Sequence, residues 1–137
     1  MAKLFCVLFA FILAFVAVDA HRNFLSHCDA KSLFYQSNTA KPNPYVLSAL
    51  CGGKWLKINL NACVSNNDGD LEWNKETPNY AASCTKCYIR TRWDRLEFTC
   101  IKCRMEDGKN LSNSNNRGGP SLVLNNGIGL VNGQLAC

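Results

Sequence analysis

The chain has 137 residues, a formal net charge of +5 and nine cysteines. This length accommodates one domain or two very small lobes. The positive charges are scattered along the chain, and their only local concentration, at Arg90, Arg92 and Arg95, is typical of a solvated strand face. We therefore expect no nucleic-acid partner.

The first segment of the chain has the pattern of a secretory signal peptide. Lys3 gives a positive start, residues 4–18 are almost wholly apolar, and Val18 and Ala20 fit the small-residue rule for cleavage. The apolar run is too short to span a bilayer comfortably, and no later segment is a candidate span. We therefore expect residues 1–20 to be removed, leaving residues 21–137 as a secreted, extracellular protein with no membrane span.

Cysteine is the most informative residue type in this sequence. Eight cysteines follow residue 20, and an even number in a small exported chain predicts up to four disulfides. A small chain buries a limited core, and each cross-link contributes about 2–4 kcal/mol by restricting the unfolded ensemble. The eight are Cys28, Cys51, Cys63, Cys84, Cys87, Cys100, Cys103 and Cys137.

Four of these cysteines have a second interpretation. Cys84 with Cys87, and Cys100 with Cys103, form two CxxC motifs whose spacing would indicate structural zinc in a cytosolic chain. Zinc ligation requires reduced thiolates, whereas an exported chain meets an oxidising compartment. We therefore predict disulfides with no metal or cofactor, and a zinc-ribbon nucleic-acid binder is the alternative.

The chain also contains an internal repeat. At a shift of 64 positions, residues 58–61 lie over residues 122–125, and Asp68-Gly69 lies over Asn132-Gly133. An Asx-Gly pair between apolar positions indicates a hairpin, because both central residues of a type I′ turn need positive φ. Each half therefore predicts a Leu-Asn motif followed by a short hairpin.

The segments upstream of these motifs correspond as well. Residues 47–51 resemble residues 96–100, and the second of these alternates apolar and polar residues as strands do. No long segment shows a helical period. Residues 109–120 are polar and indicate a loop, which holds the N-glycosylation candidate Asn110. The sequence thus predicts a compact, pseudo-symmetric all-β structure.

No catalytic constellation stands out along the chain. His21 and His27 are the only histidines, and neither a Ser-His-Asp triad nor a pair of acid–base carboxylates is visible. We therefore expect a protein that binds a ligand and not an enzyme.

This order of motifs resembles the cyanovirin-N homology family, a family of small sugar-binding proteins. The resemblance covers nearly the whole chain after residue 20 and implies two pseudo-symmetric lobes that exchange strands. Lobe A would comprise about 21–62 plus 128–137, and lobe B about 63–127. The segments that carry the resemblance are 24–28, 47–51, 58–61 and 66–73 in the first half, and 83–84, 96–100, 122–125 and 127–135 in the second.

The resemblance also implies two of the disulfides, Cys28–Cys51 and Cys84–Cys100. The other four cysteines depart from the family pattern. We expect Cys87–Cys103, because each lies three residues beyond one of the implied partners. Cys63–Cys137 then follows by elimination.

The family's sugar site in lobe B maps onto six positions of this chain. Such side chains supply the directed donors and acceptors that neighbouring sugar hydroxyls require. The alternative for Asp68 is that it only forms the turn. The alternative for Lys102 and Arg104 is that they are only exposed charges on a strand. The six are Asn66, Asp68, Asn79, Ser83, Lys102 and Arg104.

The corresponding site in lobe A is weaker. Leu130 replaces a polar family residue, and Gly52-Gly53 removes side chains where the family places polar ones. We therefore expect one working site, in lobe B. The lobe A positions are Asn23, Ser26, His27, Gly52, Lys54 and Asn132.

Together these observations predict a non-catalytic, metal-independent lectin for mannose-type oligosaccharides. Its partners would be oligosaccharides or high-mannose glycoproteins, and the protein would be a monomer or weak dimer. The alternative is a secreted cysteine-rich defence or effector protein that kept the fold without binding sugar.

Overall fold

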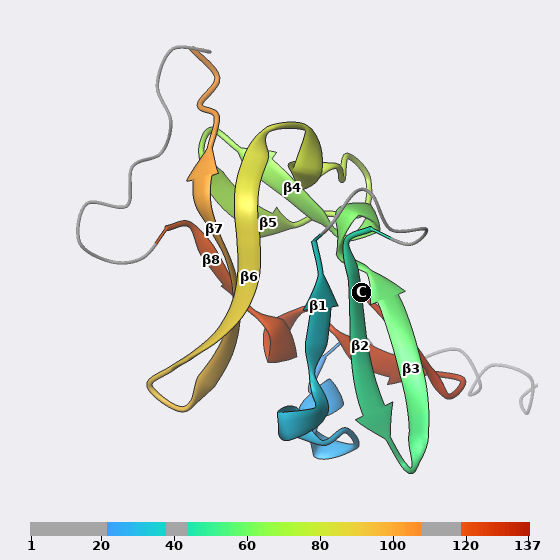
Figure 1. The fold of residues 1–137 in the computed structure, drawn as a ribbon. Coiled ribbons are helices and arrows are strands. Elements are labelled where there is room, and N and C mark those ends of the chain that lie inside the picture. Colours follow the sequence, from blue (N-terminus) through green and yellow to red (C-terminus); the bar gives the residue numbers. More distant parts are fainter. Residues whose placement is uncertain (1–21, 38–43, 108–118) are drawn as a thin grey trace, which may run out of the picture.

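The computed structural model describes residues 22–37, 44–107 and 119–137, which form an all-β structure (Figure 1). The expected signal peptide, the sequon at Asn110 and most of the expected loop 109–120 lie outside the described residues. Within these ranges there is no α-helix, only short 3-10 turns. A search of the same ranges for a helix long and apolar enough to cross a membrane found none.

The first sheet contains β1 (Phe34–Gln36), β2 (Val46–Cys51) and β3 (Lys54–Asn59) in that order, with antiparallel pairing. In β2 every second residue is buried, starting at Leu47. This period of two is what a strand with one core-facing side requires. The central strand therefore supplies Leu47, Ala49 and Cys51 to the core, and β3 adds Ile58.

The second sheet contains β6 (Cys84–Arg92), β7 (Arg95–Cys103) and β8 (Ser121–Val123), also antiparallel and in that order. β6 and β7 are joined by a turn at Trp93 and Asp94, whose φ angles are 46° and 60°. Positive φ at both central residues is the type I′ geometry that suits the twist of a hairpin.

Two short hairpins follow the Leu-Asn motifs, as the repeat predicts. The first joins β4 (Val64–Asn67) to β5 (Asp70–Trp73), and the second joins β9 (Gly129–Val131) to β10 (Gln134–Ala136). Their turn residues all have positive φ, at Asp68, Gly69, Asn132 and Gly133. Both Asx-Gly hairpin predictions are confirmed.

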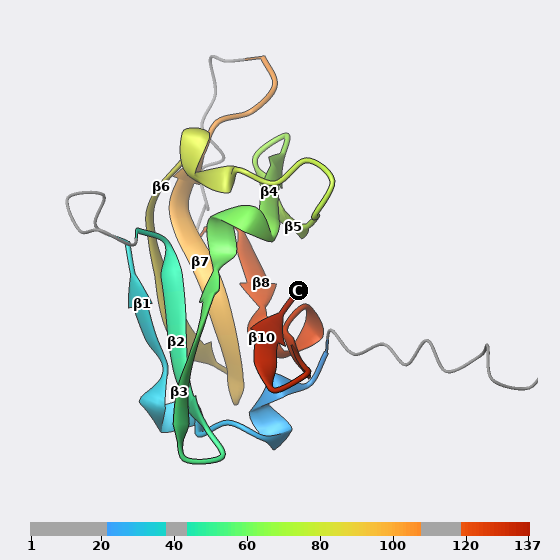
Figure 2. The ribbon, with the colours of Figure 1, turned by 90° about the vertical axis from the view of Figure 1, so that its right-hand side faces the viewer.

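Each hairpin packs on the sheet of the other half. β5 contacts β8 of the second sheet, and β10 contacts β3 of the first sheet. Figure 2 shows β4, β5 and the turn before β6 at one end of the molecule, and the β2–β3 turn at the other. This exchange confirms the predicted two-lobed fold, whereas the exact limits of the lobes stay a prediction.

The repeat is also visible in the core, where counterparts from the two halves occupy equivalent buried positions. All of these side chains are at most 1% exposed. Because both members of each pair are buried, the two halves share one continuous apolar core. The pairs are Leu60 with Leu124, Val64 with Ile128, and Tyr80 with Phe24.

All eight cysteines of residues 21–137 form disulfides, and two of the four expected pairs are wrong. Cys28–Cys51 and Cys63–Cys137 are confirmed. Instead of Cys84–Cys100 and Cys87–Cys103, the structure joins Cys84 to Cys103 and Cys87 to Cys100. The reason is the antiparallel register of β6 and β7, in which moving forward along one strand moves backward along the other.

The wrong pairing came from an alignment of the two halves that was shifted. Leu47 in β2 pairs with Ile58 of β3, and Phe98 in β7 pairs with Leu122 of β8. Ile58 and Leu122 are counterparts in the repeat, because they lie 64 positions apart. Phe98 is therefore the counterpart of Leu47, and Cys100 then corresponds to the buried Ala49. Cys87–Cys100 is thus an addition of the second half. Because both CxxC motifs are used in disulfides, the disulfide interpretation is confirmed over the zinc alternative.

A pair of contacts, which we call the exchange contact, fixes the two hairpins to the body. Cys63–Cys137 ties the last residue of the chain to the residue before β4. In the repeat, Gly127 is the counterpart of Cys63, and Trp73 is the counterpart of Cys137. These two residues are also in contact, since a Cβ on Gly127 would lie 2.0 Å from Trp73 Cδ2. The packing of Trp73 on Gly127 is thus the counterpart of the Cys63–Cys137 disulfide.

The revised pairing can be tested by tryptic mapping without reduction, because Lys86 and Lys102 separate the cysteines of each CxxC motif. We expect the peptide 76–86 to be linked to 103–104, and the peptide 87–90 to be linked to 96–102. Mass spectrometry of the non-reduced digest, prepared with thiols blocked at acidic pH, distinguishes the pairings. A linked species of 76–86 with 96–102 would contradict the structure.

The exchange contact predicts that Gly127→Ala destabilises the protein. The added methyl group would overlap the Trp73 ring, and overpacking of this kind costs about 1–3 kcal/mol. Urea unfolding of Gly127→Ala, Trp73→Leu and the double variant gives the coupling free energy. We expect the double variant to be more stable than the sum of the single effects, and simple additivity would argue against the contact.

Candidate functional site

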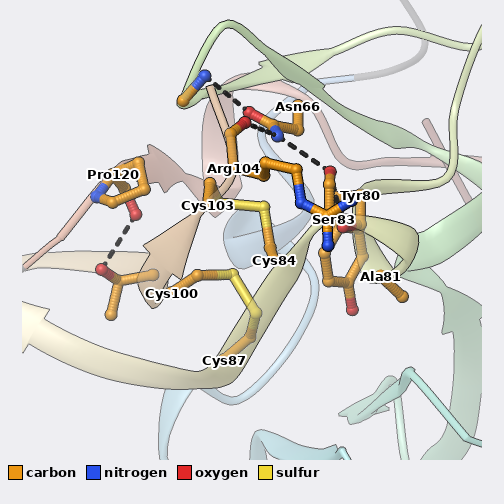
Figure 3. The surroundings of a disulfide bond; sticks show 12 residues. Asn66, Tyr80, Ala81, Ser83, Cys84, Cys87, Cys100, Cys103, Arg104 and Pro120 are labelled. Carbon is orange, nitrogen blue, oxygen red and sulfur yellow. Dashed lines mark hydrogen bonds between the residues drawn. A yellow bond between two sulfur atoms is a disulfide. The ribbon is translucent and has the colours of Figure 1, made fainter. Parts of the chain in front are cut away.

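Asn66 is the centre of the polar cluster at the β4–β5 end of the molecule (Figure 3). Its Nδ2 donates to Ser83 Oγ at 2.8 Å and to the backbone oxygen of Arg104 at 2.7 Å. Its Oδ1 accepts from the backbone N–H of Gly69 at 2.9 Å. Both N–H donors of the amide are therefore used within the protein. Asn66 joins three segments and positions the groups around it.

Asp68 combines the turn role and a second link across the cluster. Its φ of 48° places it in the β4–β5 turn, and its Oδ1 accepts from the backbone N–H of Glu106 at 2.8 Å. A carboxylate has two oxygens and about four acceptor positions, so one such bond leaves others for a ligand. The turn and the segment after β7 are thereby held together.

Lys102 is the next-to-last residue of β7, and Arg104 directly follows the strand. The backbone N–H of Arg104 donates to the Ser83 oxygen at 2.8 Å, which fixes this segment against the turn before β6. Both residues are exposed, while Cys103 between them is buried. Within the part of the chain that the structure describes, neither side chain forms an ion pair. Their charged groups are available to a ligand.

Asn79 lies apart from the Asn66 network. Its φ is 102°, its backbone N–H donates to the Val64 oxygen at 3.0 Å, and its Oδ1 accepts from Asn61 Nδ2 at 3.1 Å. The structure thus gives Asn79 a place at the start of the 3-10 turn Tyr80–Ala82. Its contact with sugar stays a prediction.

Asn61 is a supporting residue that the sequence-based site did not include. Besides its bond to Asn79, its Oδ1 accepts from the Ala81 backbone N–H at 2.9 Å. It therefore fixes the turn that delivers Ser83 to the cluster. The repeat could have indicated this role, because its Leu-Asn motif places Asn61 and Asn125 at equivalent positions.

The lobe A counterpart keeps the scaffold but lacks the central amide. Asn125 Nδ2 donates to Asn23 Oδ1 at 2.8 Å, and Asn125 Oδ1 accepts from Leu25 N at 3.1 Å, as in the other half. However, Leu130 stands where Asn66 does, and His27 stands in place of Ser83. A leucine cannot bridge three segments by hydrogen bonds.

The remaining lobe A positions are exposed and not joined to one another. Lys54 begins β3, and Asn132 has a φ of 51° in the β9–β10 turn. Ser26 Oγ donates to its own turn, at the Asn23 oxygen, and Gly52 lies in the β2–β3 turn. Among the described residues, the side chains of Lys54, Asn132 and His27 make no hydrogen bond, so the structure assembles the polar network in lobe B.

Half-buried Tyr35 of β1 and buried Tyr80 of the 3-10 turn form a pair. The hydroxyl groups of Tyr35 and Tyr80 are hydrogen-bonded to each other, and both rings pack edge-on against Phe98 with centroid distances of 5.2 and 5.0 Å. Burial raises the pKa of Tyr35 from 10.0 to about 12. Burial is the main cause that raises the pKa of Tyr80 still further, and the nearby Tyr35 is the second cause. The pair connects the first sheet to the turn that carries Ser83.

Comparison with known proteins places this fold in context. The family model described as the CVNH domain matches residues 24–136. Microvirin, solved in complex with mannobiose, is 23% identical, with a TM-score of 0.59 over 84% of this chain and 97% of that chain. The Gibberella zeae CVNH structure is 17% identical, with a TM-score of 0.59 over 83% and 95%. A search of curated proteins found no match.

The tyrosine pair predicts a loss of stability at alkaline pH. Because the folded-state pKa of Tyr35 is raised from 10.0 to about 12, the stabilisation is complete below pH 10 and is lost as the pH rises toward 12. Urea unfolding across this range, with phenolate absorbance recorded in parallel, checks this. Tyr35→Phe should reduce the pH dependence and Tyr88→Phe should not. Phenolate formation by the pair without unfolding would contradict it.

Proposed function

The chain belongs to the CVNH family, and from this premise we propose that it is a secreted, non-catalytic lectin that binds mannose-type oligosaccharides in lobe B without a metal ion. Secretion rests on the signal-peptide pattern of residues 1–20. The sugar preference rests on the family and on the mannobiose named with the similar microvirin. The proposed ligands include high-mannose glycoproteins.

The observation that carries the proposal is the network around Asn66. Its three hydrogen bonds bring the β4–β5 turn, Ser83 and Arg104 into one surface. Recognition of a sugar depends on polar groups held at fixed positions, because each directed hydrogen bond contributes only about 0.5–1.5 kcal/mol net. A site built from prearranged backbone avoids much of the ordering cost of binding.

The groups of this surface have complementary functions toward a saccharide. The Asp68 carboxylate accepts hydrogen bonds from neighbouring hydroxyls, and the side chains of Lys102 and Arg104 donate them. Asn66 acts through these groups as a positioning residue, since its own donors are occupied. Binding is reversible and no covalent step is required.

The proposal predicts that Asp68→Asn and Arg104→Ala each weaken mannobiose binding by about tenfold, which is the loss of about 1.4 kcal/mol. Asparagine is chosen at position 68 because it tolerates the positive φ of the turn. Isothermal titration calorimetry of the purified residues 21–137, guided by a glycan array, measures the effect.

The lobe A counterpart supplies the matched control. Asn132→Asp occupies the equivalent turn position and should leave the affinity unchanged. If the folded wild-type protein binds no glycan on the array, the interaction-protein alternative replaces the lectin proposal. If mannobiose binds but neither lobe B variant weakens it, the assignment of the site is wrong.

A further inference from the structure

A separate hollow lies beside the turn of the β6–β7 hairpin. Its volume is about 360 Å³, which is at the lower end of the range that small-molecule sites occupy. Its polar lining comes from Asp94 and Arg95 of the hairpin and from Asn125 and Asn126 of the 3-10 turn Leu124–Asn126. None of these residues belongs to the proposed lobe B site or to the lobe A positions.

The walls of the hollow are held in place by the fold. Asn125 is fixed by its bonds to Asn23 and Leu25. Asp94 is fixed in the type I′ turn, and Arg95 begins β7 directly opposite Arg92. The hollow therefore exists before a ligand binds, which lowers the ordering cost of binding.

The polar groups of the hollow have unused hydrogen-bonding capacity. Over residues 22–37, 44–107 and 119–137, the side chains of Asp94, Arg95 and Asn126 make no hydrogen bond or ion pair, and all three are exposed. Together they offer a carboxylate acceptor, a guanidinium donor and an amide that does both. This is a complete set of partners for adjacent hydroxyl groups.

The remaining lining distinguishes between classes of ligand. Leu25, Leu96 and Val123 contribute an apolar strip, which suits the C–H face of a sugar ring. The single negative charge of Asp94 lies next to the single positive charge of Arg95, so the hollow does not favour an anion. The same turn carries Trp93, which is 80% exposed with the Arg92 guanidinium 4.2 Å above its ring. Such an exposed ring can stack on a saccharide.

We propose that this hollow is a second saccharide site, which binds one neutral sugar ring through Asp94, Arg95 and Asn126. It goes beyond the proposed lobe B function because it involves different residues at a distance from that site. Figures 1 and 2 show the β6–β7 turn towards the end of the molecule opposite the β4–β5 hairpin. Two sites on one chain would allow it to bridge two branches of a glycan.

The experiment is an NMR titration of ¹⁵N-labelled residues 21–137 with five separate probes. The probes are mannobiose, glucose, galactose, N-acetylglucosamine and xylose. The backbone amides of Asp94, Arg95 and Asn126 report on the hollow, and those of Gly69 and Glu106 report on lobe B. With three directed groups at an open surface, we expect saturable shifts at the hollow with an affinity of about millimolar.

Variants separate the two sites. Arg95→Ala combined with Asn126→Ala should weaken binding at the hollow by about tenfold and leave the lobe B shifts unchanged. Lys57→Ala, an exposed strand cation outside the hollow, is the control and should change neither. Asp68→Asn should affect only the lobe B shifts.

The outcomes distinguish this inference from the proposed function. Shifts confined to Gly69 and Glu106 with all five sugars would overturn the second site and leave the lobe B lectin standing. Shifts confined to the hollow would support the second site and would contradict sugar binding in lobe B. Hollow shifts that persist unchanged in the double variant would also overturn the assignment.

Discussion

The structure depends on the exchange contact, through which each short hairpin is held on the sheet of the other half. Cys63–Cys137 joins positions that are 74 residues apart, and closing a loop of that length restricts the unfolded chain strongly, by about 4 kcal/mol in the chain-entropy model. Cys63 also immediately precedes β4, the strand that carries Asn66. The same cross-link therefore secures the fold and sets the position of the candidate site.

The two halves show how one scaffold can hold two different surfaces. Asn61 and Asn125 make the same pair of hydrogen bonds in their own halves, so the turns that frame both sites have the same local support. The difference lies in the amide of Asn66 and in its partner Ser83, which His27 replaces in lobe A. Asn66 connects three segments in lobe B, whereas Leu130 at its counterpart is half-buried and packs against the core. The fold is thus retained in both halves, whereas the network around Asn66 is formed in lobe B.

The features that sequence predicted well are those set by local chemistry. The Asx-Gly turns require positive φ, and each follows a Leu-Asn motif of the repeat, so both short hairpins could be predicted from the chain. The pairing of Cys84 and Cys87 could not, because it depends on the register of β7 against β6, and the resemblance of residues 96–100 to 47–51 pointed to a register that was shifted. The full use of Asn66's donors, and a hollow built from Asp94 and Asn126, depend on contacts between distant segments that leave no local pattern.

The added disulfide Cys87–Cys100 gives the long hairpin a specific mechanical role. It crosses β6 and β7 between Cys84–Cys103, next to the lobe B cluster, and the turn at Trp93 and Asp94. Cross-strand links restrict sliding and separation of the two strands. The first half has Ala49 in place of Cys100 and therefore lacks such a link. A rigid hairpin would hold ligands at its two ends at a fixed separation, so any gain from binding both would depend on the glycan matching that spacing. Selectivity would then come from geometry between sites in addition to contacts within each.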